Sequence, residues 1–307
     1  MDIDRLISIA WNRIEQGNID GAIDSLRQAL SFDPDIAEAH AYLSLCLLNK
    51  KRLHAALNEA KMALVLNSEL EIAIYALANT YIGQRKFKEA KIHINHLIDM
   101  NPNNSRYYLL NANLHQNLRK FDKILPMLEK ALELEPESPD ILSELSDYFL
   151  RKGDVVKAEK YAIESLQCQP ENVAGLVSMG NVLIRRGQLN DARDHAIWAL
   201  RQDPENNGAL VLLAGIKARS NPLLGVWWRY SVWLSSMGST RSILILLFAY
   251  VVYRIVTMAS QDLGHQNIAS IINYLWLAIV IYTFVGPTIF KNSVNKELES
   301  VSLSRDY

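Results

Sequence analysis

The chain has 307 residues, and its charge divides them into two unequal parts. Residues 1–222 hold 55 of the 65 charged side chains and the last 85 residues hold 10. This difference favours one part in water and one part in lipid over two soluble domains. Residues 1–222 carry 26 basic and 29 acidic residues, so their balance excludes the basic patch that nucleic-acid binding needs. Two cysteines exclude a disulfide scaffold, and they are not spaced as a zinc or redox pair.

The N-terminus predicts no secretory signal. Two acidic residues precede its first apolar run, MDIDRLISIAWN, and a signal peptide needs a basic start. We therefore expect residues 1–222 to fold in a reducing compartment that resembles the cytosol.

Residues 3–206 repeat with a period of 34. Small residues recur at this period from Ala10, Ala22 and Ala29, and proline recurs at Pro34, Pro102, Pro136, Pro170 and Pro204. Small residues on two helices let the backbones approach where the helices cross, and the residue before a proline leaves the helical region. Glycines at 17, 153 and 187 fall between the paired helices, where a left-handed turn favours glycine. The pattern predicts stacked helix pairs in a solenoid.

These residues resemble the tetratricopeptide repeat family over six repeats. The segment 207–219 resembles the helix that caps such solenoids. The resemblance implies an all-α fold in which six helix pairs and a capping helix form one domain, residues 1–219. Three departures from the family pattern put local packing in question: Arg13 and Asn111 in place of larger apolar residues, and Ile124 in place of alanine.

Two long apolar runs follow in residues 241–290. The run 242–258 has one charge, Arg254, and the run 268–290 has none. At 1.5 Å per residue the second run spans about 34 Å, enough for the ~30 Å thickness of a hydrocarbon core, whereas the first, at about 26 Å, is short and would need a thinner bilayer or its flanking residues. The two runs predict a transmembrane hairpin. Two buried helices of a soluble protein are the alternative.

The charges around these runs predict their orientation. The loop 259–267 has no Lys or Arg, whereas basic residues precede the first run and follow the second. The positive-inside rule then places the solenoid, both chain ends and the polar tail 291–307 in the cytoplasm. The overall plan resembles bacterial inner-membrane tetratricopeptide repeat proteins with a C-terminal hairpin, which implies a bacterial inner membrane as the location. A mitochondrial or endoplasmic membrane is the alternative.

The segment 220–240 carries one apolar stripe with several aromatic residues. Such side chains suit the headgroup zone, which predicts an interfacial helix. Packing against the last repeat is the alternative. The predicted membrane-interface residues are Trp227, Trp228, Tyr230 and Trp233.

No motif predicts catalysis, a cofactor or a metal. His93 and His96 lie one helical turn apart, but no third ligand is near them in sequence, so we interpret them as packed or solvated histidines. No phosphate-binding glycine loop, nucleophile elbow or zinc-protease motif is present. We therefore expect a protein that is not an enzyme.

A binding surface remains. In the family that the chain resembles, the first helices of successive repeats line a concave groove. Amide side chains both donate and accept, which suits an extended peptide backbone. Solvated polar residues without a function are the alternative interpretation. Arg106, Arg151 and Arg185 near the groove edge are interpreted as a solvated rim, and selection of an acidic ligand is the alternative. The predicted groove residues are Tyr75, Asn79, Leu109, Asn113, Ser143, Asp147, Val177 and Asn181.

The sequence thus predicts a membrane-anchored adaptor or scaffold that binds a protein or peptide in its groove. A second hypothesis makes the chain an accessory or assembly subunit of a larger membrane complex, bound mainly through its hairpin. An enzyme or a transporter is disfavoured, because two spans enclose no pathway.

Overall fold

The computed structural model describes residues 3–204, 206–220, 239–263, 266–267, 269–277 and 280, with side chains left out at 218–220 and 239–249. The chain forms two compact units, residues 1–178 and residues 179–307. We call them the N-terminal unit and the C-terminal unit. The predicted interfacial residues Trp227, Trp228, Tyr230 and Trp233 lie outside the described residues, as does the tail 291–307.

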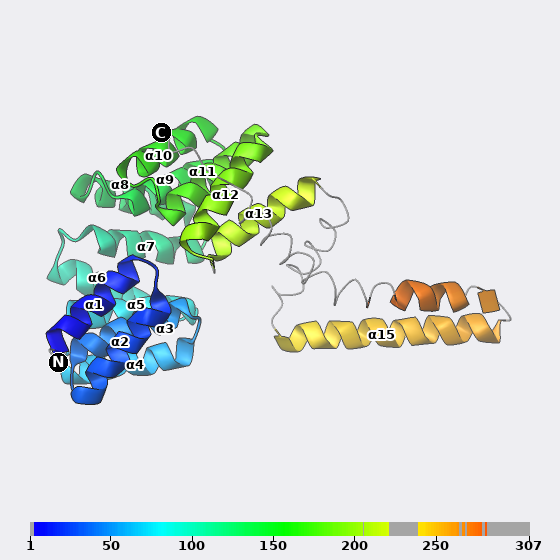
Figure 1. The fold of residues 1–307 in the computed structure, drawn as a ribbon, viewed down its shortest axis with the longest axis horizontal. Coiled ribbons are helices and arrows are strands. Elements are labelled where there is room, and N and C mark those ends of the chain that lie inside the picture. Colours follow the sequence, from blue (N-terminus) through cyan, green and yellow to red (C-terminus); the bar gives the residue numbers. More distant parts are fainter. Residues whose placement is uncertain are drawn as a thin grey trace. The chain divides into compact units, whose positions relative to one another are not determined.

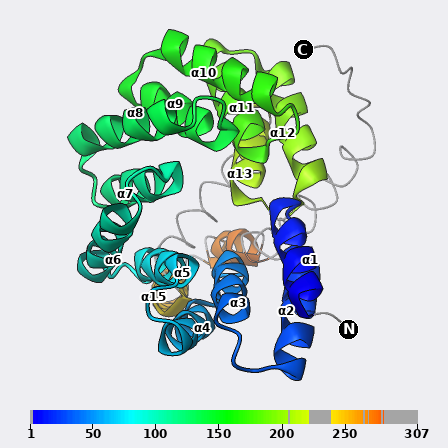
Figure 2. The same ribbon diagram turned by 90° about the vertical axis from the view of Figure 1, so that its left-hand side faces the viewer.

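The N-terminal unit is a series of antiparallel helix pairs. Within each pair the two helices pack together, and the first helices α1, α3, α5 and α7 also contact one another in order. Figures 1 and 2 show these pairs following one another in chain order. The elements are α1 (Ile3–Glu15), α2 (Ile19–Phe32), α3 (Ala37–Asn49), α4 (Leu53–Leu66), α5 (Glu71–Gly83), α6 (Phe87–Met100), α7 (Ser105–Asn117), the 3-10 helix η1 (Phe121–Lys123), α8 (Ile124–Leu134), α9 (Pro139–Lys152) and α10 (Val155–Cys168).

Helix α11 (Val173–Arg186) crosses the boundary between the units. The C-terminal unit continues with α12 (Leu189–Gln202), α13 (Asn207–Ser220) and α15 (Ser239–Asp262). Helix α13 packs on α12, where the resemblance places a capping helix. A Cβ on Gly180 of α11 would lie 2.4 Å from Leu212 Cδ2 of α13, so this small residue is required by a close approach.

The 34-residue repeat is confirmed by burial. The small residues in its three phases are almost completely buried where paired helices cross, as Ala10, Ala22 and Ala29 illustrate. In the second repeat the hydroxyl of Ser44 donates to the carbonyl oxygen of Ala56 at 2.7 Å, which joins α3 to α4. The predicted left-handed glycines between paired helices are also confirmed, with φ of 74°, 85° and 81° at residues 17, 153 and 187.

The departures from the family pattern are accommodated locally. Arg13 donates to the carbonyl oxygen of Gly21 and to the hydroxyl of Ser25, both at 2.7 Å, and so ties α1 to α2. Ile124 is fully buried and begins α8, which has 11 residues where the other second helices have 14. Proline lacks the N–H that a helix interior needs, so Pro126 fits only a first turn, and η1 replaces the missing start of this helix.

The described parts of the two apolar runs are helical and pack on each other. Tyr253 of α15 donates its hydroxyl to Asn273 Oδ1 at 2.6 Å, and its ring stacks on Trp276 with centroids 4.7 Å apart. The helical stretch 269–277 thus lies beside α15 (Figure 1).

The predicted membrane spans are not supported by the described helices. Within the part of the chain that the structure describes, none of the helices combines the length and apolar character needed to cross a membrane. Residues 281–290 of the second predicted span and the side chains of 242–249 in the first lie outside that part.

Candidate functional site

The predicted groove residues that share the repeat phase of Tyr75 are more buried than the side chains of an open binding surface would be. Tyr75 on α5 is half-buried and packs near Tyr107 of α7, with ring centroids 6.3 Å apart. The hydroxyl of Tyr107 donates to Glu71 Oε2, which ties the third repeat to the fourth. Leu109 is half-buried as well and packs into the core of the fourth and fifth repeats. These side chains support the surface as much as they line it.

The predicted asparagines are partly occupied by bonds to their own helices. Asn79 Nδ2 donates to the carbonyl oxygen of Tyr75 at 3.0 Å. Asn113 is exposed, and it accepts two hydrogen bonds from Asn117 Nδ2, one at Asn113 Oδ1 at 2.7 Å and one at the Asn113 carbonyl oxygen at 2.9 Å. Asn181 is half-buried and belongs to the C-terminal unit. The amides of Asn79 and Asn113 therefore offer a ligand fewer groups than the sequence pattern alone indicated.

The fifth repeat ties its groove residues to the next helix. Ser143 is buried, donates to the carbonyl oxygen of Pro139 at 2.6 Å, and lies 3.0 Å from the hydroxyl of Ser165. Asp147 accepts a hydrogen bond of 3.0 Å from the hydroxyl of Ser178. Val177 on α11 is half-buried. Ser143 therefore acts in helix packing, whereas Asp147 keeps a carboxylate near the surface.

An aromatic and arginine cluster lies on the same side as these residues and was missed by the sequence analysis. The Trp11 ring of α1 lies 5.3 Å from the Tyr42 ring of α3, and the guanidinium of Arg106 lies over Trp11 at 5.5 Å from the ring centre. This cation–π contact joins the first helix of the first repeat to that of the fourth. Trp11 has the same repeat phase as Asn79, so the 34-residue register could have identified it.

The charge of Arg106 reaches the neighbouring tyrosines. Burial raises the pKa of Tyr42 and of Tyr75, and Arg106 lowers both in part. Asp140 of α9 raises the pKa of Tyr75, so this carboxylate lies close to the aromatic cluster. We use the name inner face for the surface formed by Trp11, Tyr42, Tyr75, Arg106, Asp140, Glu144 and Asp147.

The part of the inner face on α9 is acidic. Asp140, Glu144 and Asp147 are spaced by four and three residues, which puts them on one side of the helix. Burial raises the pKa of Glu144, and the neighbouring carboxylates raise it further, while Arg151 lowers it. Burial also raises the pKa of Asp147, against the hydrogen bond from Ser178 and the charge of Arg151. Arg151 donates to Gln116 Oε1 at 2.9 Å. The arginines interpreted as a solvated rim thus contact other side chains at Arg106 and Arg151.

These raised pKa values predict a dependence of stability on pH. The unfolded chain has ordinary carboxyl pKa values, so the charged forms of Glu144 and Asp147 disfavour folding at neutral pH, and that cost disappears as pH falls through the raised pKa values. We expect Glu144→Gln/Asp147→Asn to raise the free energy of unfolding at pH 7, with a difference from the parent that shrinks toward about pH 4, the ordinary carboxyl range. Urea unfolding at a series of pH values measures the difference. Glu129→Gln on the exposed side of α8 is the control, and a pH-independent difference for the double variant would refute the expectation.

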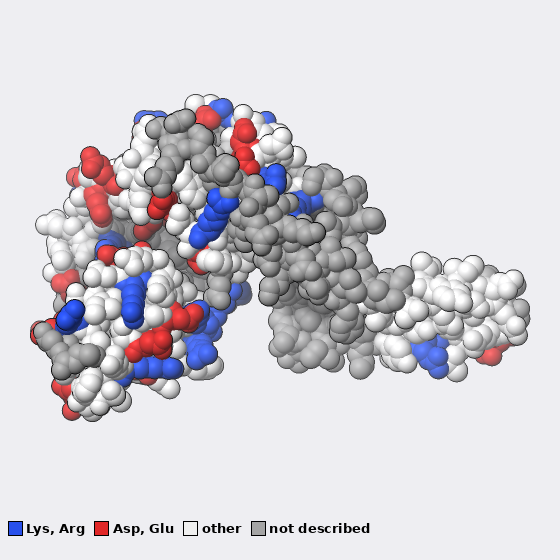
Figure 3. Space-filling model, viewed as in Figure 1, with Lys and Arg blue, Asp and Glu red and all other residues white. Residues whose placement is uncertain are grey.

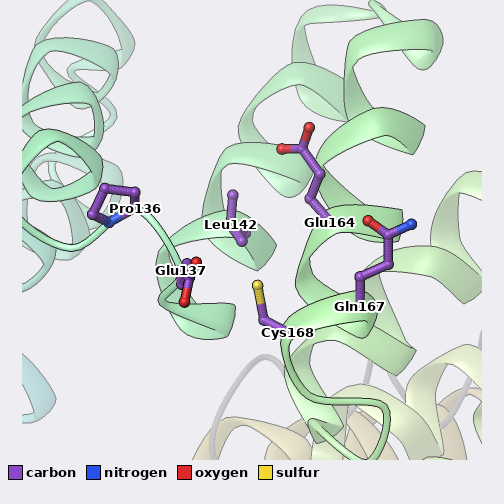
Figure 4. A pocket seen from close by; sticks show the side chains of 6 residues that line it. All are labelled: Pro136, Glu137, Leu142, Glu164, Gln167 and Cys168. Carbon is purple, nitrogen blue, oxygen red and sulfur yellow. The ribbon is translucent and has the colours of Figure 1, made fainter.

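A surface hollow beside α9 and α10 has few groups that could take part in catalysis. It has a volume of about 450 Å³ and lies between the loop before α9 and the end of α10. Figure 4 shows the sulfur of Cys168 directed toward Leu142 and Glu137, with Glu164 and Gln167 along α10. The residues that line the hollow include no histidine or lysine that could activate this thiol, and Cys168 is exposed to solvent.

Of the two histidines weighed for metal binding, His93 is used in packing and His96 is exposed. The ring of His93 stacks on Tyr81 with centroids 5.7 Å apart, and burial lowers the pKa of His93, with a smaller effect from His96. Among the described residues no group of three or more His, Cys, Asp or Glu could hold a metal ion.

Comparison with known proteins agrees with the repeat architecture. The tetratricopeptide repeat signature matches residues 8–68, 73–104, 109–173 and 177–221. The type IV pilus assembly protein PilF of Pseudomonas aeruginosa is 24% identical over 163 residues, which are 52% of this chain and 64% of that protein. The chain thus matches less than two thirds of the length of this distant relative.

Solved structures show the same fold at low sequence identity. A tetratricopeptide repeat protein from Parabacteroides merdae is 16% identical with a TM-score of 0.56, and the match covers 69% of this chain and 82% of that one. Yeast Tom70 is 19% identical with a TM-score of 0.51, and the match covers 76% of this chain and 51% of that one. Since the repeat signature covers more than half of its residues, this chain belongs to the tetratricopeptide repeat family.

Proposed function

We propose that this protein is a membrane-attached adaptor that holds an extended segment of a protein partner on its inner face. Tetratricopeptide repeats are protein-interaction scaffolds, and families built on them are typically not enzymes. The observation that carries the proposal is the combination on the inner face of half-buried aromatic rings with desolvated carboxylates. Aromatic rings supply apolar contact at a low cost in conformational entropy. Carboxylates that are partly shielded from water favour a partner with positive charge.

The charges of the inner face favour a partner segment with basic residues. Arg106 is engaged by the Trp11 ring, and Arg151 by Gln116, whereas Glu144 and Asp147 have raised pKa values that an incoming cation would restore toward normal. A lysine or arginine beside α9 would therefore gain an ion pair and relieve the cost of the buried charges. Asn79 and Asn113 would contact the backbone of the same segment.

The attachment to a membrane is proposed from the C-terminal unit. Both helices of its hairpin leave large apolar side chains exposed, and Figure 3 shows this surface as almost free of charge. Exposed apolar surface of this extent is typical of an interaction with lipid or with another protein. The exposed residues with described side chains include Val251, Ile255, Met258, Ile271, Leu275 and Leu277. The Lys and Arg residues that flank the apolar runs in sequence support an orientation with the solenoid and both chain ends in the cytoplasm. We propose a bacterial inner membrane as the location.

The same apolar surface supports a second candidate function, that of an accessory or assembly subunit bound to a larger membrane complex through its hairpin. The distant relative PilF is a type IV pilus assembly protein, which agrees with such a role. In this case the partner would contact the hairpin, and the inner face would be dispensable.

Crosslinking in native membranes distinguishes the two candidates. We expect the intact chain to capture a partner, and Asn79→Ala/Asn113→Ala/Asn181→Ala to reduce the captured amount by at least about 10-fold, the effect of losing about 1.4 kcal/mol of binding energy. The matched control is Asn58→Ala/Asn95→Ala/Asn190→Ala, which removes three exposed asparagines from second helices. If the groove variant captures the same partners in the same amounts, the asparagines do not bind and the hairpin is favoured as the contact surface.

A further inference from the structure

Three successive turns of the N-terminal unit share an unusual sequence. Between the paired helices of the second, third and fourth repeats, two adjacent cations precede an apolar residue: 51–53 reads KRL, 85–87 reads RKF and 119–121 reads RKF. The same turns in the first, fifth and sixth repeats read GNI, GDV and GQL. We call the six cations the basic edge, and all of them are exposed: Lys51, Arg52, Arg85, Lys86, Arg119 and Lys120.

The first cation of each pair occupies a backbone position that favours glycine. Lys51, Arg85 and Arg119 have φ values of 58°, 61° and 58°. They lie just past the ends of α3, α5 and α7, where the backbone closes the helix in a left-handed turn, and L residues are strained in this conformation. The equivalent glycines in the other three repeats have nothing within 4 Å of a Cβ position. Neighbouring side chains therefore do not account for the cations.

The second cation of each pair occupies a position that favours a hydrogen-bond acceptor. Arg52 and Lys86 stand at the N-caps of α4 and α6, and Lys120 at that of η1, and none of them caps its helix with a side-chain hydrogen bond. At the same position in the first and fifth repeats, Asn18 accepts from Gly21 N and Asp154 accepts from Lys157 N. Each basic turn therefore gives up two local stabilising features, and what it gains is positive charge.

The fold brings these charges together. Lys51, Arg52, Arg85 and Lys86 line one hollow of about 760 Å³, and Gln84 Nε2 joins the two turns by donating to the carbonyl oxygen of Leu53 at 3.1 Å. Figure 3 shows Lys and Arg gathered at the lower right-hand edge of this part of the solenoid.

The charges lack acidic partners and extend to the fourth repeat. Within the described part of the chain, no carboxylate lies within 4 Å of any of the six cations. After burial, the charges of Lys123, Lys120 and Lys91 lower the pKa of His115, so cations of the third and fourth repeats are close as well. The even charge balance of residues 1–222 had concealed this concentration of positive charge.

We propose that the basic edge binds the anionic phosphate headgroups of a membrane surface. The proposal rests on the membrane attachment proposed above, which would hold the edge near lipid. Lipid is favoured over an acidic protein segment because Phe121, which directly follows the cation pair of the fourth repeat, is 41% exposed. Cations beside exposed aromatic residues are typical of surfaces that lie in the headgroup zone. The six cations also match the size of basic clusters that attract anionic lipids.

The proposal is tested with the full chain in lipid nanodiscs. A donor dye is attached to Asn49→Cys in a Cys168→Ser background, and an acceptor dye is carried by lipid headgroups. Cys46 stays unlabelled, because it is buried and burial raises the pKa of its thiol to about 11. The discs contain phosphatidylcholine alone or with phosphatidylglycerol. The test variant is Lys51→Gly/Arg85→Gly/Arg119→Gly, and the control is Lys61→Ala/Lys130→Ala/Lys160→Ala, which removes the same charge from second helices.

We expect phosphatidylglycerol to raise energy transfer in the parent and in the control, and raising the salt to about 1 M to abolish the increase. The triple glycine variant should lose it, because each cation contributes about a five-fold shift toward the docked state, or about 100-fold for three. Equal energy transfer with and without phosphatidylglycerol would overturn the proposal, as would capture of soluble polyglutamate by a chain that ignores the lipid. A chain that does not co-purify with discs of phosphatidylcholine alone refutes the membrane attachment instead, so the two failures are distinguishable.

Discussion

Lys51→Gly/Arg85→Gly/Arg119→Gly is expected to stabilise the N-terminal unit by about 2 kcal/mol. Relief of the left-handed conformation gives about 1–2 kcal/mol at each position, and the greater freedom of glycine in the unfolded chain removes about 0.5–1 kcal/mol of it. For a unit of 178 residues this corresponds to a rise in Tm of roughly 4–8 °C. Thermal unfolding followed by circular dichroism measures the change.

The reverse substitutions provide the control. Gly17→Ala/Gly153→Ala introduces the same strain where φ is 74° and 85° and where no atom obstructs the new Cβ, so only the backbone term changes. We expect this variant to lose about 1–2 kcal/mol in total. A triple glycine variant that is less stable than the parent would show that the cations stabilise the turns. Their presence in the basic edge would then be explained by stability alone.

Leu128→Ala is expected to have the largest effect of a single substitution, a loss of about 3 kcal/mol. Leu128 of α8 is fully buried in the cluster that joins the fourth and fifth repeats, where it packs with Ile124, Ile141 and Leu145. Truncation removes the transfer free energy of the side chain and leaves a cavity, which together cost about 2–5 kcal/mol. Urea unfolding measures the loss, and Val65→Ala, at an 80% exposed position, is the control.

The location of the effect is a further test of the solenoid. Since each repeat contacts mainly its neighbours, we expect Leu128→Ala to lower amide hydrogen-exchange protection most in α7, α8 and α9. Protection in α1 and α2 should change little. An equal loss in all helices would mean that the N-terminal unit unfolds as one cooperative body.

The helical repeat was predictable because packing imposes it on every repeat. Small residues recur at the helix crossings of every repeat and a proline follows five of the six second helices, so the signal at 34 residues survives local exceptions such as Ile124 and Ser68. The shortened α8 was not predicted, although Pro126 carries the reason: a helix that began at Phe121 would place this proline in its interior. The sequence showed the cause, but only the helix boundary showed where it acted.

The candidate site was less predictable, because repeat phase gives the side of a helix and not the partners of a side chain. Ser143 has a groove phase and is nevertheless buried between α9 and α10. Asn79 and Asn113 have the predicted phase, but each bonds within its own helix. The contact of Arg106 with Trp11 joins residues 95 positions apart in sequence, and no periodic pattern encodes such a pair.

That contact has a kinetic consequence for any ligand of the inner face. A segment that lies between α1 and α7 must first part the guanidinium of Arg106 from the indole of Trp11. The observed association rate constant is then the intrinsic value multiplied by the fraction of molecules in which the two side chains are apart. A substitution that removes the arginine would speed association while leaving the carboxylates of α9, and the charge that they select, in place.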